Sequence, residues 1–309
     1  MPLPTLSVVV PTRNRAAHAA DCARSILSGT GFAGLVVVDQ SDDRETETAL
    51  AALADRRVRY VRSELRGATN GRNLGIELSK GAVIAFTDDD CRVAPGWVPS
   101  ITAIFANDPD VAVVCGRVRV AEALQREGFA ATFEPRIRNW QGRFPPPQHD
   151  WGISANFAVR RDVFARVGPF DGRLGPGSPL GCGEEHDLLF RVLKAGLKVV
   201  NAREVEVEHL GIRAHGPEAR ELWRLYAMGT AAALFKHVRL GDSDAMKLYL
   251  RHLVGCGRLI FTNVVHLHQP IGFGYTLAFL SGALASLRFG VDRKQRLYVS
   301  RGRNDVGPA

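Results

Sequence analysis

Short apolar segments alternate with segments of helical spacing over the first third of the chain. Four of them have the length of strands and end in polar residues: 6–10, 35–38, 58–61 and 82–87. Predicted helices at 16–27, 45–53 and 70–80 separate them. Strands that alternate with helices of about ten residues are typical of a doubly wound, mostly parallel α/β sheet. We therefore predict this fold, continued by a helix at 97–105, a strand at 111–120 and a helix at 161–167.

Polar side chains follow each predicted strand, among them Thr12, Asp39 and the run Asp88, Asp89 and Asp90. Open α/β sheets bind ligands at the carboxyl ends of their strands. Two carboxylates about 4 Å apart repel by about 4 kcal/mol at an effective dielectric of 20, so three together favour a bound cation. A solvated acidic turn is the alternative. Neither GxGxxG nor GxxxxGK[ST] occurs after the first strand, which disfavours a dinucleotide fold and a P-loop.

A second acidic cluster opens a predicted helix that starts at Glu184 and ends before Gly196. At 100° per residue, Glu185 falls in the apolar arc of this helix. Burial near other acids would raise its pKa toward that of a general base. The apolar arc is formed by Leu188, Leu189, Val192 and Leu193, and the opposite arc by Glu184, Asp187, Arg191 and Lys194.

Two simpler readings remain open for this part of the chain. Acids in a first helical turn favour the helix dipole, and Asp187 can pair with Arg191 one turn later. His209 alternates with acids and shares one face of a predicted strand with Val205 and Val207. A histidine on an apolar face is more often a core residue than a ligand.

The C-terminal hundred residues predict helices at 220–240 and 245–265, followed by 271–287, which holds no charged residue. Seventeen uncharged residues are the lower limit for crossing a bilayer. Residues 251–309 contain eight Lys or Arg and two Asp or Glu. This pattern favours an interfacial helix on anionic lipid. The alternative is a buried helical hairpin with a solvated basic tail.

Amino-acid composition indicates which kinds of binding partner and which cellular compartment to expect. The chain has 309 residues, 46% hydrophobic and 23% charged, with a formal charge of +8. This charge favours anionic partners such as nucleotides or acidic lipid, and we expect no nucleic acid because no such motif is present. Five scattered cysteines without a CxxC pair indicate reduced thiols and a cytoplasmic protein. The first residues do not have the pattern of a signal peptide.

Over residues 5–212 the chain resembles the family 2 glycosyltransferases of GT-A fold. The matching segments, in order, are SVVVPTRNR, VVVDQSDD, GATNGRNLGIELSKGAVIAFTDDD, ANFAVRRDVFARVGPFD, GEEHDLLFRVLKAG and VEVEH. The resemblance implies a nucleotide-diphosphate sugar donor, Mn²⁺ or Mg²⁺, and inversion at the anomeric carbon. It divides the chain into a GT-A domain at 1–215 and a helical, basic, membrane-associating region at 216–309. Within the first, 1–120 would hold the nucleotide-sugar and 121–215 the acceptor.

The resemblance also implies roles for individual residues. Glu185 matches the catalytic base, although aspartate is commoner there. Asp39 matches the acid that reads the base, and the second acid usual in the family is here Gln40. The donor set is Pro11, Thr12, Arg13, Asp39, Gln40, Arg72, Asn73, Asp88 and Asp89; the metal set is Asp88, Asp90 and His209; the acceptor set is Asn156, Glu184 and Asp187, with the loop 168–177.

These residues predict transfer of a sugar to a hydroxyl of a glycan or lipid-linked acceptor in the synthesis of cell-surface polysaccharide or glycolipid. The QxxRW motif of processive polymerases is absent from the sequence, which favours addition of a single sugar. UDP is the expected nucleotide, with dTDP or GDP as alternatives, and the inner face of the plasma membrane is the expected location. Two other functions stay open: a sugar-nucleotidyltransferase, and a non-catalytic membrane partner that binds a nucleotide-sugar.

Overall fold

The structure, a computed structural model, describes residues 3–120, 124, 128, 130–145, 151–214, 216–265 and 271–301. For 263–265 and 271 it describes the backbone alone. The expected basic residue Arg303 lies outside this part of the chain.

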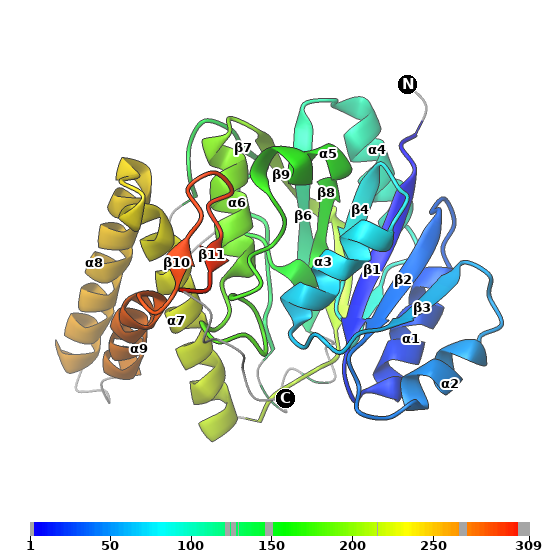
Figure 1. Cartoon of the computed structure of the whole chain (residues 1–309), viewed down its shortest axis with the longest axis horizontal. Helices are drawn as coiled ribbons and strands as arrows, with labels where there is room; N and C mark the ends of the chain where they lie inside the picture. The colour runs from blue at the N-terminus through cyan, green and yellow to red at the C-terminus, as the bar shows by residue number, and fades with distance from the viewer. Residues whose placement is uncertain are drawn as a thin grey trace.

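A nine-stranded mixed sheet forms the centre of the molecule (Figure 1). Its first four strands are parallel, in the spatial order β3-β2-β1-β4, and their bounds are β1 (Leu6–Thr12), β2 (Gly34–Asp39), β3 (Val58–Arg62) and β4 (Val83–Phe86). The sheet continues through β8 (Phe157–Arg160), β6 (Val111–Val120), β9 (Lys198–His209) and β5 (Cys91–Val93), and β7 (Asn139–Trp140) pairs with β9. The parallel order predicted from sequence holds for the first four strands and for the pair β6 and β9. Strand β8 is antiparallel to both β4 and β6, and β5 and β7 are antiparallel to β9.

Helices cover both faces of the sheet, as the apolar periodicity predicts. They are α1 (Ala16–Leu27), α2 (Glu45–Ala51), α3 (Ala68–Leu78), α4 (Trp97–Asn107), α5 (Arg161–Val167) and α6 (Glu184–Lys194), with a 3₁₀ turn η2 (Ser154–Asn156) before β8. The predicted α/β fold is confirmed. The short strands β5, β7 and β8 are the elements of this sheet that the sequence pattern did not predict.

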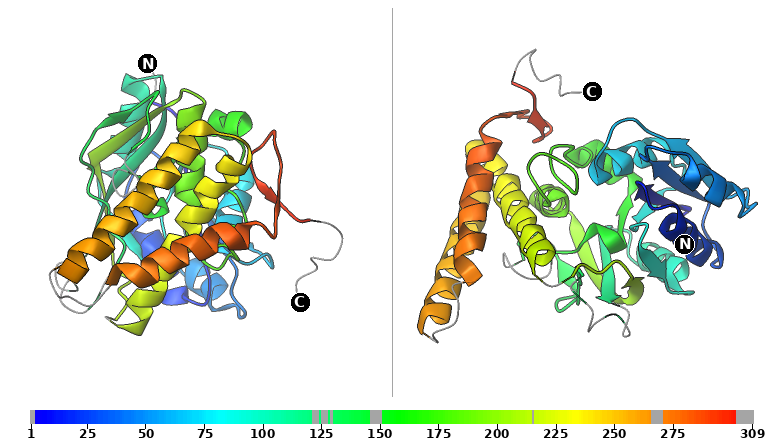
Figure 2. Two further views of the ribbon diagram at one scale, coloured as in Figure 1. Left: turned by 90° about the vertical axis from the view of Figure 1, so that its left-hand side faces the viewer. Right: turned by 90° about the horizontal axis from the view of Figure 1, so that it is seen from below.

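The C-terminal region consists of α7 (Pro217–Arg239), α8 (Ser243–Val265), α9 (Ile271–Ser286) and a hairpin of β10 (Gly290–Val291) and β11 (Tyr298–Val299). Helix α7 packs between the sheet domain and the outer pair α8 and α9 (Figure 2). Over the described residues, no helix is long and apolar enough to cross a membrane.

Glycines let α7 approach the start of α6 closely. A Cβ atom on Gly229 would lie 2.0 Å from the carbonyl oxygen of Cys182, and one on Gly183 would lie 2.5 Å from Gly229. The amide of Cys182 donates a hydrogen bond to the carbonyl of Leu225 at 3.0 Å. Buried residues of α7, α8 and α9 belong to the same apolar core as the sheet. The packing is therefore continuous across residue 215, where the sequence predicts a domain boundary.

A buried cluster of charges fixes α6 against its neighbours. Asp187 accepts hydrogen bonds from Arg191 at 2.8 Å and from His237 at 2.9 Å. The ammonium of Lys236 lies 2.6 Å from both Asp187 and Asp171. Although burial opposes ionisation of Asp187, Arg191, Lys236 and His237 hold its pKa well below the usual range. Two carboxylates and two cations balance in this core, which joins α6, α7 and the loop before α6.

This cluster corrects the helical-wheel prediction for α6. Glu184, Asp187 and Arg191 were expected on the face opposite the apolar arc, and all three are buried. Helix α7 and the loop after α5 cover that face, and they supply ionic partners for its side chains. Of the four residues predicted there, only Lys194 is exposed.

Replacing Lys236 by methionine should destabilise the fold by about 3–5 kcal/mol, because Asp171 and Asp187 would keep their charges without the buried cation between them. Urea denaturation measures this loss. The same substitution at Lys247, whose side chain is 67% exposed, should change the free energy of unfolding by less than about 0.5 kcal/mol. Equal effects at the two positions would contradict a structural role for the cluster.

Stability should also fall as the solution is acidified below neutrality. Burial is the main cause that lowers the pKa of His237 and of His252 to about 4. Histidine in an unfolded chain titrates near about 6.5, so between these values the unfolded chain binds protons that the folded chain refuses. The free energy of unfolding should therefore rise from about pH 4 to 6.5 and level off above. Replacing His237 by glutamine should flatten this slope in urea titrations; an unchanged slope would contradict the assignment.

Candidate active site

Arg72 joins the two acidic clusters that the sequence predicts. Its side chain is 1% exposed; one guanidinium nitrogen donates to Asp88 at 2.7 Å and another donates to Glu184 at 3.0 Å. Asp88 follows β4, and Glu184, 112 positions after Arg72, opens α6, so two distant parts of the chain meet at this cation. Burial opposes the charge of Arg72, yet Asp88 and Glu184 raise its pKa above the ordinary value.

Asp89 contacts the last residue of β1. It accepts a hydrogen bond from Thr12 Oγ1 at 2.7 Å and forms an ion pair with Arg15, also at 2.7 Å. Burial raises the pKa of Asp89 to about 7, and the neighbouring Asp90 and Asp88 add to the rise against the effect of Arg15 and Thr12. Arg15, just before α1, also donates to Asp90 Oδ2 at 2.7 Å. This arginine therefore supplies the second cation of the site.

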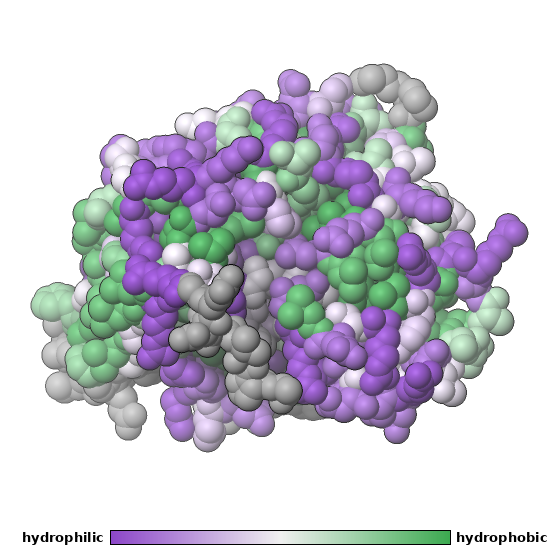
Figure 3. Space-filling view, viewed as in Figure 1, coloured by the Kyte–Doolittle hydropathy of each residue, from purple (hydrophilic) through white to green (hydrophobic). Residues whose placement is uncertain are grey.

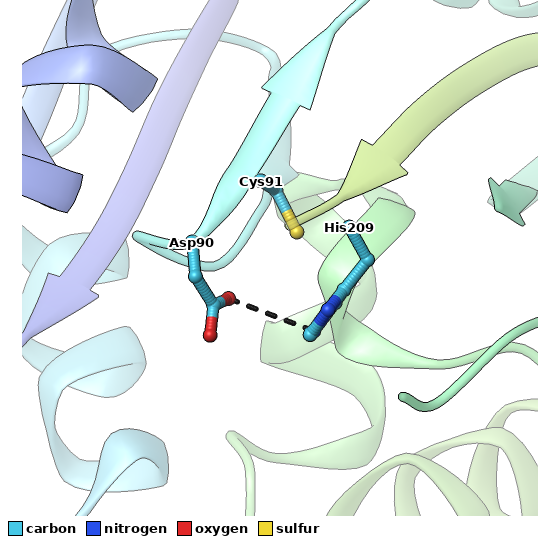
Figure 4. A group of neighbouring side chains, drawn as sticks. All are labelled: Asp90, Cys91 and His209. Carbon is cyan, nitrogen blue, oxygen red and sulfur yellow. Dashed lines mark ion pairs between the residues drawn. The ribbon is translucent and has the colours of Figure 1, made fainter. Parts of the chain in front are cut away.

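Asp90, Cys91 and His209 form a group with metal-ligand chemistry (Figure 4). One ligand atom from each lies within 4.8 Å of the others, because Cys91 of β5 pairs directly with His209 of β9. Asp90 Oδ1 is buried without a hydrogen-bond partner among the described residues and lies 3.5 Å from His209 Nε2. Carboxylate and imidazole suit Mn²⁺, and carboxylate suits Mg²⁺. The residues present therefore fit the implied cation.

The thiol of Cys91 fits such a cation less well. Burial raises the pKa of Cys91 well above its ordinary value, and Asp88 and Asp90 add to the rise. A protonated thiol is a poor ligand for a hard cation. The carboxylate and the imidazole are therefore the groups of this set that fit such a cation.

Glu185 is half-buried at the N-terminus of α6, on the same turn as the Glu184 that pairs with Arg72. Its Oε1 accepts a hydrogen bond from the backbone amide of Ser154 at 2.9 Å. Within the described residues Oε2 accepts none. The carboxyl group is thus held by one oxygen in η2 and is free at the other, an arrangement suited to accepting a proton.

The residues predicted to read the base are engaged within the protein. Both oxygens of Asp39 accept hydrogen bonds at 2.9 Å, one from the amide of Ser41 and one from the hydroxyl of Tyr60. Gln40 donates to the carbonyl oxygens of Gly67, at 3.0 Å, and Leu65. Pro11 is buried, and exposed Arg13 lies 3.4 Å from Asp42. Of these, Arg13 is the side chain open to solvent.

Asn73 and the loop 168–177 hold each other. The amide group of Asn73 donates to the carbonyl of Phe170 at 2.9 Å and accepts from its amide at 3.1 Å. The hydroxyl of Thr69 donates to the carbonyl of Leu174 at 2.6 Å. The loop is therefore packed against α3, and Leu174 at its centre is fully buried.

All three predicted acceptor residues are buried. Asn156 is fully buried; its side chain accepts from Trp97 at 2.8 Å and donates to the carbonyls of Arg117 and Val205. Asp187 belongs to the buried charge cluster and is fully buried as well. Glu184 is 1% exposed, and burial together with Glu185 raises its pKa. These three side chains hold the site together from within.

Sequence reasoning missed three features of the site. Arg15 follows the assigned loop by two residues, and its charge opposite the aspartate run was an available signal. Gly211 crosses the site so closely that a Cβ there would lie 2.2 Å from Asp90 Oδ2. Burial raises the pKa of Tyr226, and nearby Cys182, Glu185 and Glu184 add to it. This tyrosine comes from α7, a part of the chain to which no sequence motif pointed.

Comparison with known proteins places this geometry in a family. The sequence model of the family described as Glycosyl transferase family 2 matches residues 7–168. Glycosyltransferase AglE from Haloferax volcanii is 30% identical over 182 residues, 57% of this chain and 59% of that protein. A glucosyl-dolichyl phosphate glucuronosyltransferase from the same organism is 28% identical over 160 residues, 49% and 50% of the two chains. The chain thus spans a little over half the length of these curated relatives.

Solved structures agree in fold. A mannosyltransferase from Pyrobaculum calidifontis, in complex with GDP-Man and Mn²⁺, superposes with a TM-score of 0.59 at 16% identity and covers 93% of this chain and 87% of its own. GalNAc-T7 with UDP, GalNAc and Mn²⁺ has a TM-score of 0.51 at 18% identity, over 74% and 50% of the two chains. With a family match over more than half of its length, this chain belongs to glycosyl transferase family 2, and its fold is of the GT-A type.

Proposed function

We propose that this protein transfers a single sugar, with inversion, from a nucleotide-diphosphate sugar to a hydroxyl of a glycan or lipid-linked acceptor, with Mn²⁺ or Mg²⁺ as cofactor. The observation that carries the proposal is the pair of ion pairs made by Arg72, which hold the N-terminus of α6 against the aspartate run. These ion pairs fix Glu184, next to the proposed base Glu185, and Asp88, close to the proposed cation site, on one guanidinium.

Each group of this pocket has a distinct role in the proposal. Glu185 accepts the proton of the acceptor hydroxyl at Oε2, while Ser154 holds Oε1. Asp90 and His209, with Asp88 from the same aspartate run, would hold the cation, which would supply Lewis-acid stabilisation of the negative charge on the diphosphate. Arg13, exposed beside β1, and Arg15 offer positive charge to the phosphates. Pro11 and Thr12 shape the floor under the nucleotide.

Donor, acceptor and location rest on the relatives and on charge. UDP, dTDP and GDP are all candidates for the nucleotide; the two solved neighbours hold GDP-Man and UDP. One relative is named for a dolichyl phosphate substrate, which supports a lipid-linked acceptor. We place the enzyme at the cytoplasmic face of the membrane.

A screen of nucleotide-sugars with Mn²⁺ tests the proposal: slow hydrolysis should release the free nucleotide diphosphate. Pyrophosphate as the product would indicate nucleotidyl transfer instead.

Replacing Glu185 by glutamine should lower kcat at least about 100-fold, because general-base catalysis is worth about 10²–10⁴ and an amide cannot accept the proton. Donor affinity, measured by calorimetry with Mn²⁺, should stay unchanged because the amide oxygen keeps the bond from Ser154. Glu77→Gln, an exposed change on α3, is the matched control and should leave kcat unchanged. Full activity of Glu185→Gln would exclude this residue as the base.

Replacing Arg15 by alanine should tighten Mn²⁺ binding about tenfold. The guanidinium pairs with Asp89 and Asp90 and repels the metal ion, so its removal favours binding of Mn²⁺. Electron paramagnetic resonance of free Mn²⁺ measures the affinity without any substrate. Arg13→Ala removes the same charge from the same loop at a side chain that does not contact these aspartates, and should change the affinity much less. Weaker binding by Arg15→Ala would show that this arginine positions Asp90 for the metal.

A further inference from the structure

Helices α8 and α9 expose apolar side chains on the side that faces away from the sheet. Three residues of α8 and three of α9 carry this outer face: Leu250, Val254, Phe261, Phe273, Leu277 and Leu284. Val254 is 57% exposed, Phe261 70% and Leu284 68%. The two helices lie side by side at the edge of the molecule (Figure 2), where hydrophobic residues gather in the space-filling view (Figure 3).

The apolar residues follow the same spacing in both helices. Each set occupies positions i, i+4 and i+11, which at 100° per residue fall within a 40° arc. Because α8 and α9 pack against each other, the two stripes together form the apolar strip of the outer face. Isolated exposed leucines need no explanation, whereas a contiguous patch of them marks a binding surface.

Basic residues border the strip on α8. Lys247, Arg251 and Arg258 occupy the neighbouring arc of the helix, and all three are exposed. Over the described residues, Arg251 and Arg258 form no ion pair. No Asp or Glu occurs in the sequence from 245 to 291. Lys247 pairs with Asp244 at the start of α8, at 3.5 Å. Beyond that first turn the outer face combines apolar and positive side chains without a negative one.

The composition of the outer face favours anionic lipid over a second copy of the chain as its binding partner. A second copy of the chain would bring Arg251 and Arg258 near their own counterparts with no carboxylate to pair with, which disfavours a twofold interface. Anionic lipid offers what both stripes require, acyl chains for the leucines and phosphates for the arginines. The arginine stems can lie along the apolar strip with their charges in the headgroups.

The outer face is also tied to the candidate active site. His252 on the inner side of α8 stacks on Phe279 of α9 at 4.3 Å between ring centroids. Burial lowers its pKa, and His186, next to Glu185 on α6, contributes to the lowering. The helices that carry the outer face pack against α7, and α7 packs against α6, so α7 connects the outer face to the candidate active site.

We propose that the outer face of α8 and α9 lies on an anionic lipid surface and brings the active site to a membrane-borne acceptor. The inference deepens the proposed function. The membrane-borne acceptor depends on that proposed function, whereas the binding to lipid does not. Residues 288–301 contribute less than the sequence predicted, because they fold back as the β10–β11 hairpin and Arg296 pairs with Asp242 at 2.9 Å.

Vesicle sedimentation of the full chain tests this surface, with phosphatidylcholine alone or mixed with phosphatidylglycerol. The wild-type chain should bind the mixed vesicles and release them at high salt. The double variants Val254→Glu/Phe261→Glu and Arg251→Glu/Arg258→Glu should each bind at least about tenfold more weakly. The double controls Leu3→Glu/Leu65→Glu and Arg24→Glu/Arg44→Glu place the same charge changes at exposed positions elsewhere and should bind like wild type.

Three results would overturn the inference: no binding of wild type to anionic vesicles, equal losses in the controls, or a dimer in sedimentation velocity that the Val254→Glu/Phe261→Glu variant dissociates. Melting curves check that each variant is folded. Nucleotide-sugar hydrolysis without vesicles should be unchanged in the surface variants. If wild type binds vesicles and hydrolyses no donor, the proposed function fails and the membrane surface stands.

Discussion

The site depends on one buried guanidinium. Two carboxylates from distant parts of the chain offset the desolvation cost of burying Arg72. They are Asp88, after β4, and Glu184, at the start of α6. An unpaired guanidinium at 1% exposure would destabilise the fold by several kcal/mol. Loss of either carboxylate would therefore leave the charges of the remaining groups incompletely paired. The result is a fixed relation between the strand that carries the aspartates and the helix that carries Glu185. General-base chemistry requires this kind of fixed geometry.

A second set of buried charges anchors the other side of α6. Asp187 and Asp171 share Lys236 of α7, and Arg191 reaches back to the carbonyl of Pro169. Helix α6 is thus held at its first turn by Arg72 and one turn later by the C-terminal region. This explains why α7 comes so close that Gly183 and Gly229 have no room for side chains. The C-terminal helices are therefore part of the framework of the site, and they carry the outer apolar face as well.

The charge balance around the aspartates suits a ligand of mixed sign. Two cations face three aspartates: Arg15 pairs with Asp89 and Asp90, and Arg72 pairs with Asp88. Asp90 Oδ1 and His209 lie 3.5 Å apart without a hydrogen bond between them. A divalent cation with an anionic diphosphate brings nearly balanced charge into this setting. The unpartnered oxygen of Asp90 is the point at which the protein by itself is incomplete.

The sequence determined the strands, the helices and the edge at which the ligand residues collect, because burial on both faces of a sheet requires continuous apolar runs and forces polar residues to their ends. It also determined the family, through the order of its short motifs. Only the tertiary structure decided which acids of α6 turn inward, since a helical wheel does not contain the neighbours that α7 and the loop at 168–177 provide. For the same reason it alone showed that Asn73 and Asn156 bind backbone and that Arg15 reaches the aspartates. A side chain's environment comes from segments far away in sequence, and local periodicity carries no information about them.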